Sequence, residues 1–98
     1  MIAEIQCVAQ PMGTREDRYA HVDAAIAVLR ASGLHHEVGA LGTTVEGEPD
    51  VVWPLLRRVH EACLAAGADS VVSVVKLAET APGRRAPAME ELTSSHRG

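Results

Sequence analysis

Histidine and cysteine are the residue types in this chain best suited to metal binding or nucleophilic chemistry. The 98-residue sequence contains five histidines and two cysteines, Cys7 and Cys63. His35 and His36 are adjacent, so on a strand they point to opposite faces and cannot hold one ion together. His60 is three residues before Cys63, which is not the spacing of a zinc-binding helix motif. We therefore expect no metal site, and we expect both cysteines to be free thiols in the core of a cytoplasmic protein.

Other kinds of chemistry are excluded by what the sequence lacks. No recognisable nucleophile motif surrounds Ser73, so no catalytic residue is predicted. The formal net charge is −4, and only Trp53 and Tyr19 are aromatic, which disfavours binding to nucleic acid or anionic lipid. No apolar stretch is long enough to span a membrane. We expect Trp53 to anchor an otherwise aliphatic core, with stacking on a ligand as the alternative.

The elements that must position any site are predicted by hydrophobic periodicity. Ala3, Ile5 and Cys7 alternate with polar residues, which is typical of a half-buried strand. Similar reasoning predicts four strands: Ile2–Val8, Leu34–Val38, Thr43–Gly47 and Ser70–Leu77. The second and third of these are separated by the short Gly39–Gly42 segment, which is expected to be a hairpin turn.

Two helices are expected between the strands. One has Val22, Ala25, Ile26 and Leu29 on a single face and ends at Ser32-Gly33. The other carries an apolar stripe from Val52 to Ala66, and Pro54 suggests that its regular part begins near that residue. A third, short helix is predicted at Met89–Ser95.

The predicted order βαββαβ is that of an α+β, ferredoxin-like sandwich, with a four-stranded antiparallel sheet and two helices on one face. Residues 1–79 form this domain, and residues 80–98 form a C-terminal tail. The other face of the sheet would be open and would mix valines with polar groups, although the valine-rich last strand suggests cover on both sides. Because a chain this small buries limited apolar surface, a homodimer or homotetramer is expected.

A series of ordered segments resembles the thiamine-binding, YkoF-like protein family over most of the chain. The segments include Tyr19-Ala20-His21-Val22, the run from Glu37 through GTTVEGE, Val59-His60-Glu61-Ala62 and Val71-Val72-Ser73-Val74-Val75-Lys76. The Gly-Thr-x-x-Glu-Gly element of that family corresponds to Gly42, Thr43, Glu46 and Gly47. From pattern alone, this stretch reads equally well as an ordinary antiparallel strand.

The resemblance implies a ferredoxin-like oligomer that binds thiamine or its hydroxymethylpyrimidine moiety without turnover and without a cofactor. For such a ligand, Gln6 could pair with the aminopyrimidine, and Glu4 and Glu46 would attract the thiazolium cation. Thr43 and Thr44 could donate or accept hydrogen bonds. These five residues form the candidate ligand site.

Two alternative functions remain open at this stage. One is a small dimeric ferredoxin-like enzyme, an isomerase or a cofactor-free monooxygenase, for which His36 is the candidate base. The other is a regulatory module that senses an amino acid at a subunit interface.

Overall fold

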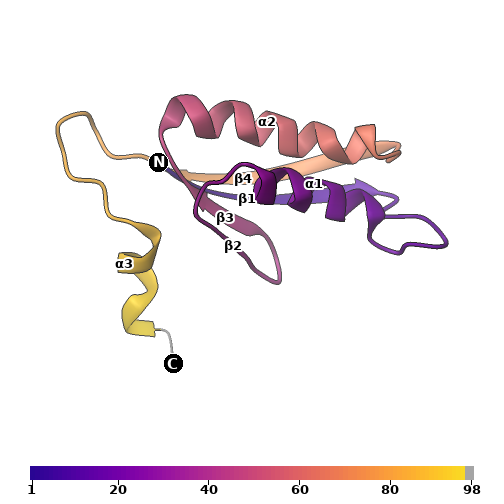
Figure 1. Ribbon diagram of the computed structural model, residues 1–98, viewed down its shortest axis with the longest axis horizontal. Helices are drawn as coiled ribbons and strands as arrows, with labels where there is room; N and C mark the ends of the chain where they lie inside the picture. Colours follow the sequence, from indigo (N-terminus) through magenta and orange to yellow (C-terminus); the bar gives the residue numbers. More distant parts are fainter. Residues whose placement is uncertain (97–98) are drawn as a thin grey trace.

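The computed structural model, in which residues 1–96 are described, contains one antiparallel sheet with two long helices on the same face (Figure 1). The strand order is β2-β3-β1-β4, so the two halves interleave as in a ferredoxin-like sandwich. The α+β fold predicted from the sequence is therefore confirmed. The elements are β1 (Ile2–Gln10), α1 (Ala20–Ala31), β2 (His36–Val38), β3 (Thr43–Glu46), α2 (Pro49–Ala65), β4 (Ser70–Ala78), α3 (Met89–Thr93) and a 3-10 turn (Ser94–His96).

Helix α2 begins earlier than Pro54 suggested, so that prediction is wrong. Glu48 is extended, and its carbonyl accepts the amides of Val51 and Val52, both at 2.9 Å. Pro49 stands in the first turn, where its missing N–H is harmless. Pro54 lies inside the helix on the exposed side, where water can hydrate the carbonyl that it leaves unpaired.

The core lies between the sheet and the helices and contains no aromatic side chain. Its largest fully buried members are Leu29, Val45, Val52, Leu55, Val59 and Cys63. Burial of each Val or Leu contributes about 1.5–3 kcal/mol, so α2, which supplies four of these six, is held mainly by its apolar stripe. Trp53 is 52 % exposed, so the expectation that it anchors the core is wrong.

The face of the sheet opposite α1 and α2 is largely uncovered in the single chain. Val72 and Val74 of β4 are 64 % and 50 % exposed, so the expected cover on both sides of this strand is absent within residues 1–96. Only the tail reaches this face, at the end of the sheet where β1 begins (Figure 1). We call this surface the open face.

Strand β1 is longer than the hairpin that pairs with it. β4 pairs with all of β1, whereas β3 pairs only with Ile2–Ile5. The Gly39 amide closes the β2–β3 hairpin by donating to the Gly42 carbonyl at 2.9 Å, as the turn prediction required. The β3-side edge of Gln6–Gln10 is therefore left without a paired strand among the described residues.

Candidate functional site

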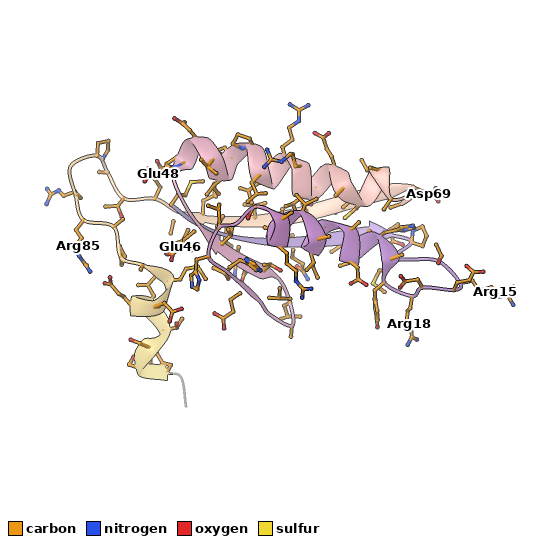
Figure 2. All side chains as sticks on the ribbon, viewed as in Figure 1. Arg15, Arg18, Glu46, Glu48, Asp69 and Arg85 are labelled. Atoms are coloured by element: carbon orange, nitrogen blue, oxygen red, sulfur yellow. The ribbon has the colours of Figure 1, made fainter. Side chains whose placement is uncertain are left out.

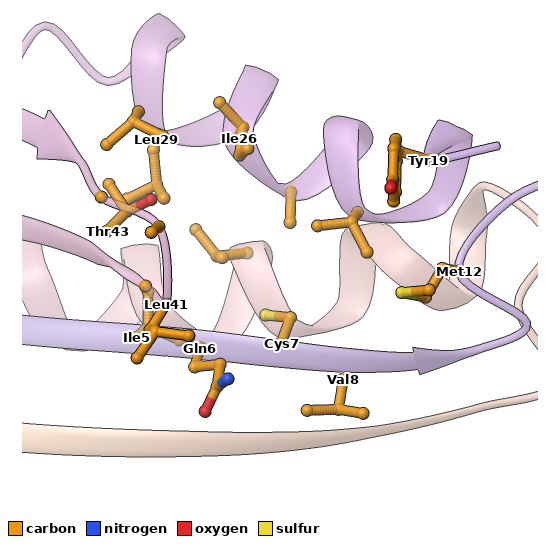
Figure 3. Close-up of a pocket in the computed structure, with 17 residues that line it drawn as sticks. Ile5, Gln6, Cys7, Val8, Met12, Tyr19, Ile26, Leu29, Leu41 and Thr43 are labelled. Carbon is orange, nitrogen blue, oxygen red and sulfur yellow. The ribbon is translucent and has the colours of Figure 1, made fainter. Parts of the chain in front are cut away.

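A cavity of about 550 Å³ opens where the hairpin stops short of the end of β1 (Figure 3). Helix α1 forms its roof, β1 its floor, and the hairpin one wall. No charged side chain among residues 1–96 lines it. The lining residues are Ile5, Gln6, Cys7, Val8, Met12, Tyr19, Val22, Ala25, Ile26, Leu29, Val38, Gly39, Ala40, Leu41, Gly42, Thr43 and Val59.

His21 fixes the loop that leads into the cavity. It is 4 % exposed at the start of α1, and its Nδ1 donates to the Pro11 carbonyl at 2.7 Å. Its backbone amide donates to the Met12 carbonyl at 2.9 Å. These two bonds join the loop after β1 to α1, and they position Met12 and Tyr19 along the cavity.

Thr43, a largely buried residue, brings a hydroxyl to the cavity wall. The residue is 4 % exposed, and its hydroxyl has no hydrogen-bond partner within residues 1–96. No fully enclosed side-chain oxygen or nitrogen in the described chain lacks a partner, so this oxygen must reach the cavity space. This hydroxyl is therefore available to hydrogen-bond to a ligand that enters the cavity.

The five candidate site residues are divided between the two faces of the sheet. Thr43 lines the cavity on the helix side. Gln6 borders it only at the edge of β1, because its exposed side chain points away from the helix layer, opposite to that of Cys7 (Figure 3). Thr44 and Glu46 lie on the open face, because side chains alternate along β3 and those of Thr43 and Val45 are buried under the helices. The structure thus does not bring all five residues to one place.

Glu4 lies between these two groups. It projects from the open face, yet its carboxyl carbon is 3.6 Å from where a side chain on Gly42 would begin. Gly42 lines the cavity, so Glu4 stands at the rim. Its Oε1 is 3.8 Å from Lys76 Nζ, and both side chains are partly exposed, so this pair contributes little to stability.

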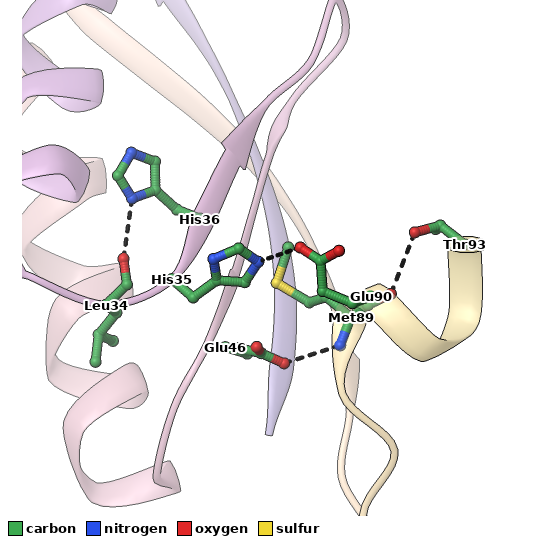
Figure 4. Close-up of polar contacts among 7 residues, drawn as sticks. All are labelled: Leu34, His35, His36, Glu46, Met89, Glu90 and Thr93. Atoms are coloured by element: carbon green, nitrogen blue, oxygen red, sulfur yellow. Dashed lines mark hydrogen bonds and ion pairs between the residues drawn. The ribbon is translucent and has the colours of Figure 1, made fainter. Parts of the chain in front are cut away.

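Glu46 is engaged by the C-terminal tail (Figure 4). Its Oε2 accepts the backbone amide of Met89 at 2.9 Å, and Met89 is 5 % exposed. Beside it, His35 Nε2 lies 3.0 Å from Glu90 Oε1. The tail therefore covers the corner of the open face that carries Glu46.

Acidic and basic side chains are absent from the cavity lining formed by the described residues, although several lie near the two ends of the sandwich (Figure 2). Arg15 and Arg18 are on the loop after β1, at the end opposite Glu46 and Glu48. The guanidinium carbon of Arg18 is 5.9 Å from the centre of the Tyr19 ring, so a cation already lies over this cavity residue.

Sequence reasoning missed most of the apolar lining of the cavity. Met12, Ile26 and Leu41 were not singled out as ligand contacts, because their role depends on the gap beyond the hairpin. In the sequence, only the short Gly39–Gly42 turn pointed to this gap. A hairpin with short strands cannot pair along all nine residues of β1.

Other predicted chemistry can also be located. His36 is on β2, where its Nδ1 donates to the Leu34 carbonyl at 3.0 Å, and it does not line the cavity. No cluster of three or more metal-binding side chains is found in residues 1–96. Over the same residues, no helix has the length and hydropathy required to cross a membrane.

The sequence and the fold were compared with those of known proteins. The profile of a family described as thiamine-binding protein matches residues 3–97. A UPF0045 protein of Clostridium perfringens is 36 % identical over 59 residues, covering 60 % of this chain and 62 % of the relative. One from Methanothermobacter thermautotrophicus is 32 % identical over 69 residues, covering 68 % and 70 %. The matches span about three fifths of the length of the first curated relatives.

Two solved structures are similar over nearly the whole chain. A Bacillus cereus domain of unknown function, DUF77, has a TM-score of 0.84 at 34 % identity and covers 98 % of this chain and 88 % of that one. A Thermotoga maritima protein provisionally assigned to thiamine biosynthesis or salvage has a TM-score of 0.79 at 25 % identity, covering 98 % and 97 %. With the profile match over residues 3–97, these likenesses show that the chain belongs to the thiamine-binding protein family.

Proposed function

We propose that this protein binds thiamine or its hydroxymethylpyrimidine moiety in the cavity between α1 and β1, without chemical turnover. The observation that carries the proposal is an uncharged cavity of about 550 Å³ with Thr43 in its wall, a residue only 4 % exposed whose hydroxyl is reached from the cavity and has no partner within residues 1–96. An apolar pocket with few polar groups is the usual form of a small-molecule site. The thiamine-binding family and the thiamine-related neighbour support this choice of ligand.

The two halves of thiamine suit different parts of the site. The neutral aminopyrimidine offers an acceptor nitrogen beside an amino donor, which suits the uncharged interior. The hydroxyl of Thr43 and the unpaired backbone edge of β1, which includes Gln6, supply donors and acceptors there. The thiazolium cation would be costly to bury, so it stays at the rim, where the carboxylate of Glu4 is near Gly42.

We assign Thr44 and Glu46 to the interface between subunits. In a homodimer or homotetramer, the open face of a second copy would cover the exposed Val72 and Val74, because large exposed apolar patches mark interaction surfaces. Thr44 and Glu46 would then contact the partner subunit and not the ligand. Two free thiols, Cys7 and Cys63, suit the reducing cytoplasm in which we place this assembly.

Titration calorimetry tests the ligand and its location together. We expect micromolar binding of thiamine and of hydroxymethylpyrimidine, and none of the isolated thiazole alcohol. Ile26→Trp fills the cavity from α1 and should abolish binding. Val51→Trp, at an exposed position on α2, is the matched control and should leave binding unchanged.

Glu46→Ala separates the cavity from the open face. If the open face held the ligand, this change would weaken binding at least tenfold, about 1.4 kcal/mol, while Ile26→Trp had little effect. The cavity proposal requires the reverse order. An absence of heat and of any thermal shift at millimolar thiamine and millimolar hydroxymethylpyrimidine would remove the proposal altogether.

A further inference from the structure

Four side chains that could do chemistry meet beneath α2, on the helix side of the sheet. Cys7 of β1 and Ser73 of β4 are directly opposite each other in the strand register. Ser73 Oγ is 3.4 Å from Cys7 Sγ and 2.6 Å from His60 Nδ1, which comes from α2. Cys63, also on α2, is near enough to Cys7 for the two thiols to influence each other's charge.

The three atoms Sγ, Oγ and Nδ1 form a continuous path for a proton. Ser73 has one hydroxyl hydrogen, so it can accept from the Cys7 thiol only while it donates to His60. Transfer of one proton along each bond gives a thiolate at Cys7 and an imidazolium at His60, still joined through the Ser73 hydroxyl. A thiolate, not a thiol, is the nucleophile, so this arrangement activates Cys7.

Cys63 differs from Cys7 in both access and ionisation. It is fully buried, and that burial, followed by the nearby Cys7, raises the pKa of the Cys63 thiol to about 11. At neutral pH its S–H is therefore retained and can donate to the Cys7 sulfur.

The cavity gives Cys7 a route to small molecules. Cys7 is half-buried and lines the cavity floor, and its side chain projects from β1 toward the helix layer (Figure 3). Cys63 does not line the cavity. An electrophile entering between α1 and β1 would therefore meet Cys7 first.

We propose that Cys7 is a reactive thiol that undergoes exchange with small organic disulfides entering the cavity, with Ser73 and His60 as positioning residues that accept its proton. The Cys7 thiolate attacks one sulfur of the disulfide, forming a new S–S bond as the old one breaks. The departing sulfur leaves with the bonding electron pair as a thiolate and takes up the proton held by His60. One thiol and one disulfide are consumed, and one mixed disulfide and one small thiol are formed.

This site does not depend on thiamine binding and goes beyond it. The two share the cavity, but exchange at Cys7 requires only access and the hydrogen-bonded path to His60. A protein that does not bind thiamine could still react at Cys7, and a protein with an unreactive Cys7 could still bind thiamine.

The rate of reaction with 4,4′-dithiodipyridine tests the proposal in the folded protein. We expect a rapid phase that releases one equivalent of thiopyridone, with peptide mass mapping placing the adduct on Cys7. Cys7→Ala should abolish that phase, and Cys63→Ala should keep it. Ser73→Ala and His60→Gln should slow it at least tenfold at neutral pH.

The pH profile distinguishes proton transfer from a merely structural role. Below the ordinary thiol pKa of about 8.5, the rate for His60→Gln should fall tenfold per pH unit, whereas the wild-type rate should fall less steeply. Ser70→Ala, on the same strand and the opposite face, is the matched control and should behave as wild type. Modification of Cys63 first, no native reaction, or wild-type rates and profiles in both Ser73→Ala and His60→Gln would overturn the proposal.

Discussion

Replacing Thr43 with Val should change stability and ligand affinity in opposite directions. Valine matches threonine in shape but lacks the hydroxyl, and this hydroxyl has no partner among residues 1–96 although the residue is only 4 % exposed. In the free protein, Thr43→Val removes a poorly satisfied polar group. In the complex, it removes the hydrogen bond that we assign to the ligand.

The expected changes in stability and in ligand affinity both follow from the position of Thr43 in the cavity wall. A buried hydroxyl without a partner costs about 1–3 kcal/mol in proteins, and contact with the cavity places this one at the low end. A gain of about 1 kcal/mol corresponds to a Tm increase of roughly 4–8 °C in a domain of this size. Loss of one hydrogen bond, about 0.5–1.5 kcal/mol, should weaken binding by about two- to twelvefold.

Thermal unfolding without ligand and calorimetric titration with hydroxymethylpyrimidine supply the two measurements. Thr44→Val is the matched control, because the adjacent side chain lies on the open face and should leave affinity unchanged. A Thr43→Val protein that is less stable than wild type, or that binds as tightly, would refute the role given to this hydroxyl.

Three further expectations concern the turn after α2, the buried thiol and the tail. Gly67→Ala should destabilise more than Gly33→Ala in urea unfolding, because Gly67 has φ +121° and a histidine nitrogen 3.2 Å from the added carbon, whereas Gly33 has open space. The pKa of Cys63 is raised from 9.0 to about 11, so its contribution to stability is complete below pH 9 and is lost toward pH 11. That loss, roughly 2–3 kcal/mol, should be absent in Cys63→Ala, and an alkaline unfolding series in which both proteins decline equally would contradict it. Glu46→Ala removes the acceptor of the Met89 amide, so trypsin should cleave the connector before α3 faster than in wild type, and unchanged cleavage would show that the tail is held by other contacts.

The sandwich could be predicted from the sequence because its elements carry strong local signals. The alternation in β1, the valine-rich run of β4, the stripe of α2 and the Ser32-Gly33 end of α1 each depend on neighbours within a few residues. Ser32 Oγ lies 2.6 Å from the Leu29 carbonyl, and Gly33 has φ +75°, as such a helix end requires. The error at Pro54 arose because a local rule, that proline disrupts helices, was outweighed by burial of Val52 and Leu55.

The site was harder to predict, because its residues come together only through the lengths and faces of separate elements. Thr43 and Thr44 are chemically equivalent in the sequence, and only the strand register places one in the cavity and the other on the open face. The exposure of Trp53 likewise follows from the side of α2 that packs on the sheet.

Local sequence patterns thus determined the secondary structure, the order of the elements and the family resemblance, because each depends on residues that are close together in the sequence. Tertiary structure alone decided that β1 extends beyond the hairpin and leaves a cavity beneath α1. It also decided that Cys7, Ser73 and His60 meet, because hydrogen bonds between residues as far as 66 positions apart exist only once strands and helix are packed.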